Sequence, residues 1–201
     1  MTNVIYYPST AATIIAQPNW LEMQETKTLV HEAAHAVIAR VLGFEVAWVS
    51  IDSDFIRKDP IAIENKCAFG DPLCMTISTP ILKPILNKRS ALNKAEKESV
   101  SGYIMHVLAG PFAERRLDPA SFDPEASYND YRQATAVLHH LGRRISEPKK
   151  FFNAAQRDLA HALDTHESSI ERVASALSLR KTLTGTDVDK IIRLASSQLA
   201  A

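Results

Sequence analysis

The segment TLVHEAAHAVIA, residues 28–39, lies in the clearest helical pattern of the sequence. Apolar residues recur there at steps of three and four, which is the period of a helix with one buried face. The pattern predicts a helix over residues 23–42, ended by Gly43. His31, Glu32 and His35 interrupt the apolar residues, and such polar groups need partners if the helix is buried.

The spacing of the two histidines favours a metal site. His31 and His35 are four residues apart, so a helix places both imidazoles on one face, where they can bind one ion. Glu32 can address a water molecule held at an open position of the metal. This arrangement is typical of zinc peptidases, in which zinc lowers the pKa of its water and a carboxylate takes the proton. A salt-bridged group of core residues is the alternative interpretation.

A catalytic zinc ion of this kind needs a third protein ligand. The extended motif with a downstream histidine is absent, because Ile38 and Val41 occupy its glycine and histidine positions. A carboxylate further along must therefore serve, and the residues leave both Glu114 and Asp130 open. Ser127 and Asp130 also fit a helix capping box, which would give Asp130 a structural role instead.

The remaining pattern predicts a mainly α protein with a small β element, an α+β fold. Strands are expected over 44–51 and 73–77, and the rest of 52–90 is expected to be loop because it contains four prolines. The other predicted helices are 92–117 with a kink at Pro111, 129–141, 148–179, and 186–195 with a cap formed by Thr186 and Asp189. Residues 1–22 are expected to be an irregular or strand-forming lead-in.

We expect one domain over residues 1–201. Its first part, 1–90, would hold the zinc-motif helix and the small sheet, and its second part, 91–201, would be helical and carry the third ligand. The length is sufficient for a hydrophobic core without disulfides or structural metal.

Composition narrows the function classes. The 201 residues carry 23 Lys and Arg against 23 Asp and Glu, which argues against a surface built for nucleic acid or anionic lipid. No apolar run approaches the ~18 residues of a membrane span, and the N-terminus lacks the pattern of a secretory signal. Cys67 and Cys74 are interpreted as free thiols in a reducing compartment, so we expect a cytoplasmic protein.

Three blocks of the sequence resemble the peptidase domain of FtsH-type zinc metalloproteases. They are VHEAAHAV at 30–37, LAGPFAE at 108–114 and ASYNDYRQAT at 126–135, and KTLTG at 181–185 is similar to the end of that domain. Order and spacing agree from about residue 24 to 195, while Ala34 and Pro111 depart from the family's usual residues.

The resemblance implies a role for each candidate residue. His31, His35 and Asp130 would bind Zn²⁺, and Glu32 would be the general base. Glu114 would lie behind the ligands and orient an imidazole. The implied fold is a zincin-like active-site helix followed by a C-terminal helical bundle.

The implied activity is that of a zinc metalloendopeptidase acting on unfolded or flexible polypeptides. Enzymes of the family normally add a membrane anchor and an ATPase module, but this sequence has no Gly-x4-Gly-Lys-[Ser/Thr] motif, so we expect a stand-alone peptidase domain without ATPase activity. A separate ATPase or self-association would then be the partners to expect. A substrate is expected to lie along the sheet edge at 73–78.

Two alternatives remain open at this point. The chain could be a non-cleaving module that binds peptides or regulates a full-length ATP-dependent protease. A purely structural zinc ion is the weaker alternative, because two histidines and one carboxylate leave one coordination position free.

Overall fold

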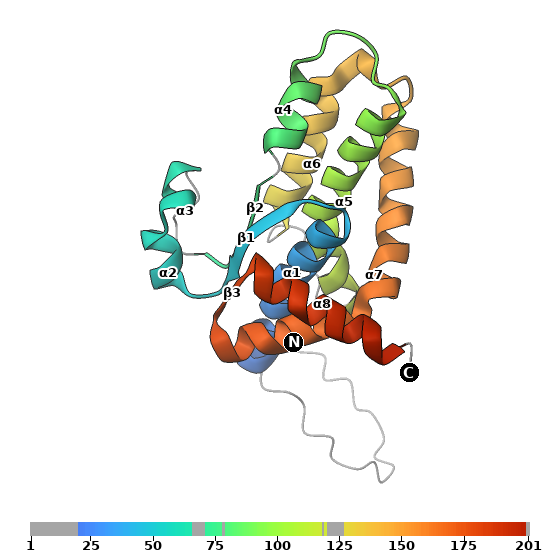
Figure 1. Ribbon diagram of the computed structural model, residues 1–201. Helices are drawn as coiled ribbons and strands as arrows, with labels where there is room; N and C mark the ends of the chain where they lie inside the picture. The colour runs from blue at the N-terminus through green and yellow to red at the C-terminus, as the bar shows by residue number, and fades with distance from the viewer. Residues whose placement is uncertain (1–19, 66–70, 78, 118, 120–126, 200–201) are drawn as a thin grey trace, which may run out of the picture.

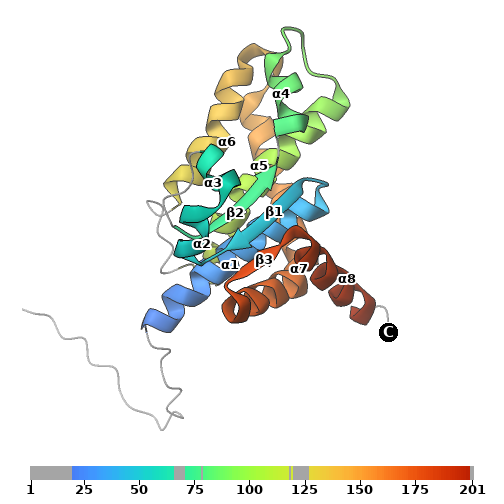
Figure 2. The same ribbon diagram turned by 60° about the vertical axis from the view of Figure 1, so that its left-hand side comes forward.

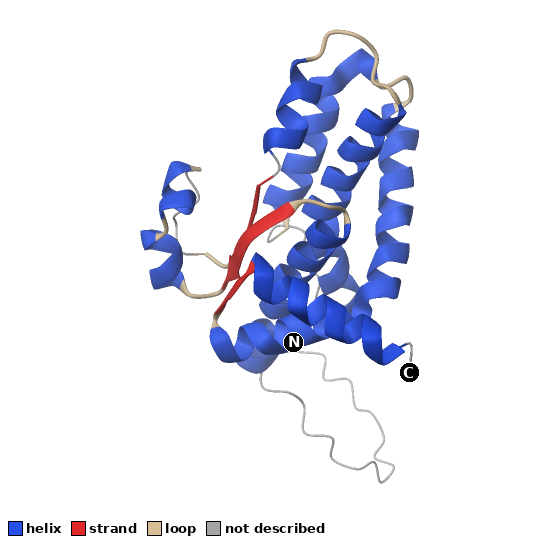
Figure 3. Cartoon of the chain, viewed as in Figure 1, coloured by secondary structure: helices blue, strands red, loops and turns tan. Residues whose placement is uncertain are grey.

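Helices account for most of the residues that this computed structural model describes, which are 20–65, 71–77, 79–117, 119 and 127–199 (Figure 3). The described elements in chain order are α1 (Trp20–Val41), β1 (Glu45–Ser50), α2 (Ser53–Lys58), α3 (Pro60–Glu64), β2 (Leu73–Ile77), α4 (Thr79–Asn87), α5 (Lys94–Leu117), α6 (Tyr128–Leu141), the 3-10 turn η1 (Gly142–Arg144), α7 (Pro148–Arg180), β3 (Thr182–Thr184) and α8 (Gly185–Leu199). The prediction of a mainly α protein with a small β element is confirmed.

Helix α1 is the central element of the fold. It contacts α5, α7 and α8 as well as strands β1 and β2, and Figure 1 shows it behind the sheet, next to the long helices. The residues of α1 with no exposed surface are mostly small: Ala33, Ala34, Ala36, Val37, Ile38 and Ala39. Small side chains at a helix contact let the neighbouring backbones approach closely. The motif histidines therefore lie in a stretch of α1 whose other residues are mostly buried.

The three strands form one antiparallel sheet in the order β2-β1-β3, so β2 and β3 are its edges within the described chain. Figure 2 shows this sheet lying across α1. Successive side chains of a strand point to opposite faces. Val49, Cys74 and Leu183 are paired in register and pack with the main core. Trp48 and Met75 form a second apolar cluster with residues of α2 and α3.

Helices α5, α6 and α7 form the larger helical part beyond the sheet. Helix α5 contacts both α6 and α7, and the three extend side by side away from the sheet in Figure 1. Their shared core includes Leu108, Val137, Leu159 and Val173. Within the described residues, none of these helices, nor any other, is long and apolar enough to cross a lipid bilayer.

The strand predicted at 73–77 is present, but the prediction that the rest of 52–90 is loop is wrong. This region also contains α2, α3 and α4. The side chains of Asp52 and Asp59 cap α2 and α3 by accepting backbone N–H groups, and Pro60 occupies the first turn of α3, where its missing N–H costs nothing. Helix α4 contains Pro84 in a run of only nine residues. The prolines therefore start or interrupt short helices rather than exclude them.

The start of the last helix also differs from the prediction. The cap is formed by Thr184 and Asp187, whose side chains and backbone N–H groups bond each other reciprocally, and the helix begins at Gly185. Asp189, expected in the cap, instead forms a bidentate ion pair with Arg40 of α1 at 2.6 Å. Strand β3 before this helix was not predicted.

The other predicted elements appear with shifts of a few residues. Helix α1 begins at Trp20, inside the expected lead-in. Helix α7 is a single helix of 33 residues, and α5 continues through Pro111. Most of the expected lead-in, together with Cys67, lies outside the described residues.

Candidate metal centre

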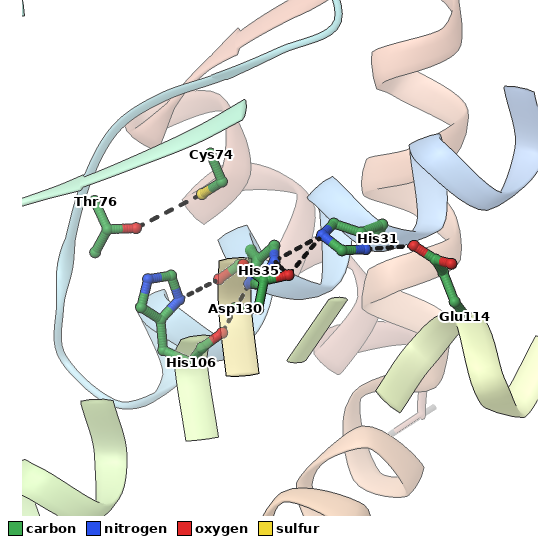
Figure 4. A network of polar contacts seen from close by, with 7 residues as sticks. All are labelled: His31, His35, Cys74, Thr76, His106, Glu114 and Asp130. Carbon is green, nitrogen blue, oxygen red and sulfur yellow. Dashed lines mark hydrogen bonds and ion pairs between the residues drawn. The ribbon is translucent and has the colours of Figure 1, made fainter. Parts of the chain in front are cut away.

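Three of the candidate residues meet at one point between α1 and α6. His31 and His35 project from successive turns of α1, and Asp130 lies in the first turn of α6. The Nε2 atoms of the two histidines are 3.0 Å apart, and Oδ2 of Asp130 lies 3.4 Å from Nε2 of His31 and 3.8 Å from Nε2 of His35. Figure 4 shows the three groups converging.

These separations suit a divalent metal ion. Zinc binds imidazole nitrogen and carboxylate oxygen at about 2.0–2.2 Å in a tetrahedral arrangement, so neighbouring ligand atoms should be about 3.3 Å apart. The three distances in the protein lie on both sides of that value, and the donor set of two imidazoles and one carboxylate is one that zinc accepts. Three protein donors would leave one corner of the tetrahedron open.

The outer nitrogens of both imidazoles are held by acceptors. Nδ1 of His31 lies 2.5 Å from a carboxylate oxygen of Glu114, and Nδ1 of His35 lies 2.7 Å from the backbone carbonyl oxygen of His106. A carbonyl oxygen can only accept, so Nδ1 of His35 donates. In the neutral imidazole, Nε2 then carries a lone pair aimed at the centre. The Nε2 atom of His31 lies only 3.0 Å away, so a proton or a metal ion has to lie between the two nitrogens.

The electrostatics of the centre also favour a cation. Burial alone would lower the pKa of His31, yet hydrogen bonds with Asp130 and Glu114 raise it to about 10. Burial alone would raise the pKa of Asp130, but its hydrogen bonds with His31 and His35 hold it below its usual range. Both shifts have the same cause, because the imidazoles and the carboxylates stabilise each other's charged forms in a partly desolvated pocket.

Glu32 lies beside this centre and reaches toward the sheet. Its side chain is buried, with 6% of the residue exposed, and this burial raises its pKa although the nearby His31 and His35 act in the opposite direction. The backbone N–H of Cys74 in the edge strand β2 donates a hydrogen bond to the Glu32 carboxylate. The candidate base is therefore fixed between the imidazole pair and the sheet edge.

The capping role considered for Ser127 is wrong. Ser127 precedes α6, but its side chain makes no capping hydrogen bond, and its buried hydroxyl has no partner in the part of the chain that is described. Asp130 turns its carboxylate to the histidines instead. Its place in the first helical turn is itself favourable for a negative charge.

Helix α5 contributes two residues that the sequence did not indicate. The helix faces the imidazoles with three residues at four-residue steps, and Gly110 and His106 precede Glu114 on this stripe. A Cβ on Gly110 would lie 2.5 Å from ring atoms of His31, so only glycine permits this approach. His106 is buried, and burial together with the neighbouring His35 lowers its pKa to about 3. Counting back from Glu114 by helical turns would have found both.

Comparison with known proteins adds no family. No protein-family model matches this chain, and no curated protein sequence matches it.

Proposed function

We propose that the chain is a zinc-dependent metalloendopeptidase, similar in its catalytic part to FtsH-type peptidases, that hydrolyses unfolded or flexible polypeptides. One observation carries the proposal. The Nε2 atoms of two imidazoles and one carboxylate oxygen converge at spacings that suit zinc, and a buried carboxylate, Glu32, lies alongside. A zincin-like active-site helix and a C-terminal helical bundle would be the corresponding parts of the fold.

The chain's own residues have distinct tasks in this reaction. His31, His35 and Asp130 would hold the ion, and Glu114 would fix the ring of His31 through its Nδ1 atom. When bound, zinc supplies a Lewis acid that polarises the scissile carbonyl and lowers the pKa of a water molecule. Glu32 then takes the proton of the attacking water on a carboxylate oxygen and passes it to the nitrogen of the leaving amine.

The electrostatics of Glu32 support that assignment. A general base has to accept a proton and keep it until the leaving group needs it, and burial raises the pKa of Glu32 in that direction. The hydrogen bond from the Cys74 N–H holds the carboxylate in place. Because this donor is neutral, it stabilises the charged carboxylate less than a cationic side chain would.

An extended substrate would pair with strand β2. This strand is an edge of the described sheet, and its residue Cys74 touches the candidate base. Edge pairing holds a peptide through backbone hydrogen bonds, so it demands little of the sequence. It does demand an extended chain, which is why unfolded or flexible polypeptides are the proposed substrates.

The test compares zinc-loaded wild-type protein with Glu32→Gln on casein, an unstructured substrate. We expect the variant to bind zinc in equal amount and to lose cleavage, whereas Glu167→Gln, at an exposed position of α7, keeps both. Cleavage by Glu32→Gln at the wild-type rate would reject the mechanism. Zinc-loaded wild-type protein that binds casein without cutting it would instead favour the non-cleaving binding module.

A further inference from the structure

We propose that His106 is a positioning residue that fixes the orientation of the metal-binding imidazole of His35. The proposal concerns a residue outside the ligand set, and it rests on the metal site of the proposed function but not on peptide cleavage. Its basis is a pair of hydrogen bonds that run in opposite directions between the same two residues.

The two bonds join α1 to α5 at a single point. Nδ1 of His35 donates to the backbone carbonyl oxygen of His106 at 2.7 Å, and Nδ1 of His106 is 3.2 Å from the backbone carbonyl oxygen of His35. Because both acceptors are carbonyl oxygens, both Nδ1 atoms must carry the proton. Figure 4 shows the two contacts side by side. Any slide or rotation of α5 against α1 would break both bonds together.

Ring packing adds to this pair. The imidazole of His106 meets that of His35 edge-on, with ring centroids 5.6 Å apart, and its centroid lies 6.1 Å from that of Phe44. His106 is 7% exposed, so its polar ring is desolvated. A leucine or phenylalanine would fill such a core position at lower cost. Histidine adds one N–H group that these residues lack, and this group donates a hydrogen bond to the backbone carbonyl oxygen of His35.

The two hydrogen bonds together set the direction in which Nε2 of His35 points. The carbonyl of residue 106 is present whatever side chain stands there, but its position relative to His35 depends on how α5 is seated on α1. The return bond from the His106 ring fixes that seating. A metal ligand has to be held within about 0.5 Å and 10–20° of its productive geometry, and a hydrogen bond to the backbone of the ligand residue helps to hold it there.

The experiment uses two substitutions that separate the N–H group from the ring. His106→Phe keeps an aromatic ring and removes the donor, whereas His106→Asn loses the ring and keeps an N–H at the position of Nδ1. We expect zinc affinity about 10-fold weaker for His106→Phe and within about threefold of wild type for His106→Asn. If His106 only fills space, the order reverses, and that order would overturn the proposal. Equal affinity for all three proteins would also overturn it.

Two further measurements keep the test independent of folding and of cleavage. Cobalt bound in place of zinc should show an altered visible absorption spectrum in His106→Phe and the wild-type spectrum in His106→Asn and in the control His139→Phe, which changes an exposed histidine of α6. In the wild-type protein, nitrogen NMR should find the proton of His106 on Nδ1, and a proton on Nε2 alone would reject the proposal. A protein that binds zinc but cuts nothing would contradict the proposed function and leave this ranking intact.

Discussion

The backbone of α5 at Gly110 touches the imidazole of His31, since a Cβ on that residue would lie 2.5–2.6 Å from three atoms of the ring. Real Cβ atoms do not approach so closely, so Gly110→Ala must push the ring or separate the two helices. We expect a loss of about 1–3 kcal/mol in the free energy of unfolding and zinc affinity weakened by at least about 10-fold. Urea unfolding and zinc titration measure the two effects.

Gly102→Ala is the matched control, because it lies in the same helix. Its Cβ would meet the ring of Phe44 at 3.4 Å and the side chain of Leu42 at 3.8 Å, which are ordinary contact distances. Alanine also favours the helix, so we expect unfolding within about 1 kcal/mol of wild type and unchanged zinc affinity. Equal behaviour of the two variants would contradict the direct role of the Gly110 contact.

Separate removal of the two carboxylates should show which one binds the metal and which one only orients a histidine. Asp130 faces both Nε2 atoms, whereas Glu114 contacts only Nδ1 of His31. We expect Asp130→Ala to lose bound zinc, and Glu114→Ala to retain most of it at an affinity about 10–100-fold lower. Metal analysis of the dialysed proteins measures this. Zinc loss in Glu114→Ala with retention in Asp130→Ala would exchange the two roles.

The ion pair between Arg40 and Asp189 should stabilise the junction of α1 and α8. Both side chains are partly buried, and the pair is bidentate. Arg40→Lys keeps the charge but cannot form both bonds, so we expect a loss of about 0.5–1 kcal/mol in unfolding free energy. Asp189→Asn should lose a similar amount, and the double variant should lose less than the sum. Strict additivity in urea unfolding would show that the pair contributes nothing.

The cap of α8 should make stability depend on acid pH. Arg180 and the side chain and N–H of Thr184 lower the pKa of Asp187 from 3.8 to about 2 in the folded protein. A lowered folded-state pKa stabilises the protein above the unfolded value and loses that contribution as pH falls through the folded value. The unfolding free energies of wild type and Asp187→Asn should therefore differ most above pH 4 and converge toward pH 2. A difference that grows on acidification would contradict this assignment.

Much of the fold follows from local patterns. The three-and-four periodicity of α1 and the long apolar series of α7 are properties of short windows of sequence, so both helices were predictable. The short helices between residues 52 and 64 were missed because their signal is a cap, Asp52 or Asp59, rather than a period. The cap of α8 was misplaced by two residues because Thr184, Thr186, Asp187 and Asp189 offer two overlapping capping patterns. Only the tertiary partner of Asp189, Arg40, decides between them.

The residues of the site also differ in how far the sequence alone could predict them. His31, Glu32 and His35 belong to one helical turn, so their spacing alone places them together. Asp130 comes from another helix, and without the resemblance the residues gave no reason to prefer it to Glu114. His106 and Gly110 lie two helical turns and one helical turn before Glu114, respectively, so the period of α5 places them on the same face, but the carbonyl contact of His106 and the close approach at Gly110 depend on how α5 packs against α1.

Anomalous diffraction at the zinc absorption edge, on crystals of the zinc-loaded protein, locates the bound ion and its ligands. We expect one ion at about 2.0–2.2 Å from Nε2 of His31, Nε2 of His35 and a carboxylate oxygen of Asp130, with solvent at the remaining position. An ion bound elsewhere, or at this place with a fourth protein ligand closing the open position, would contradict the account.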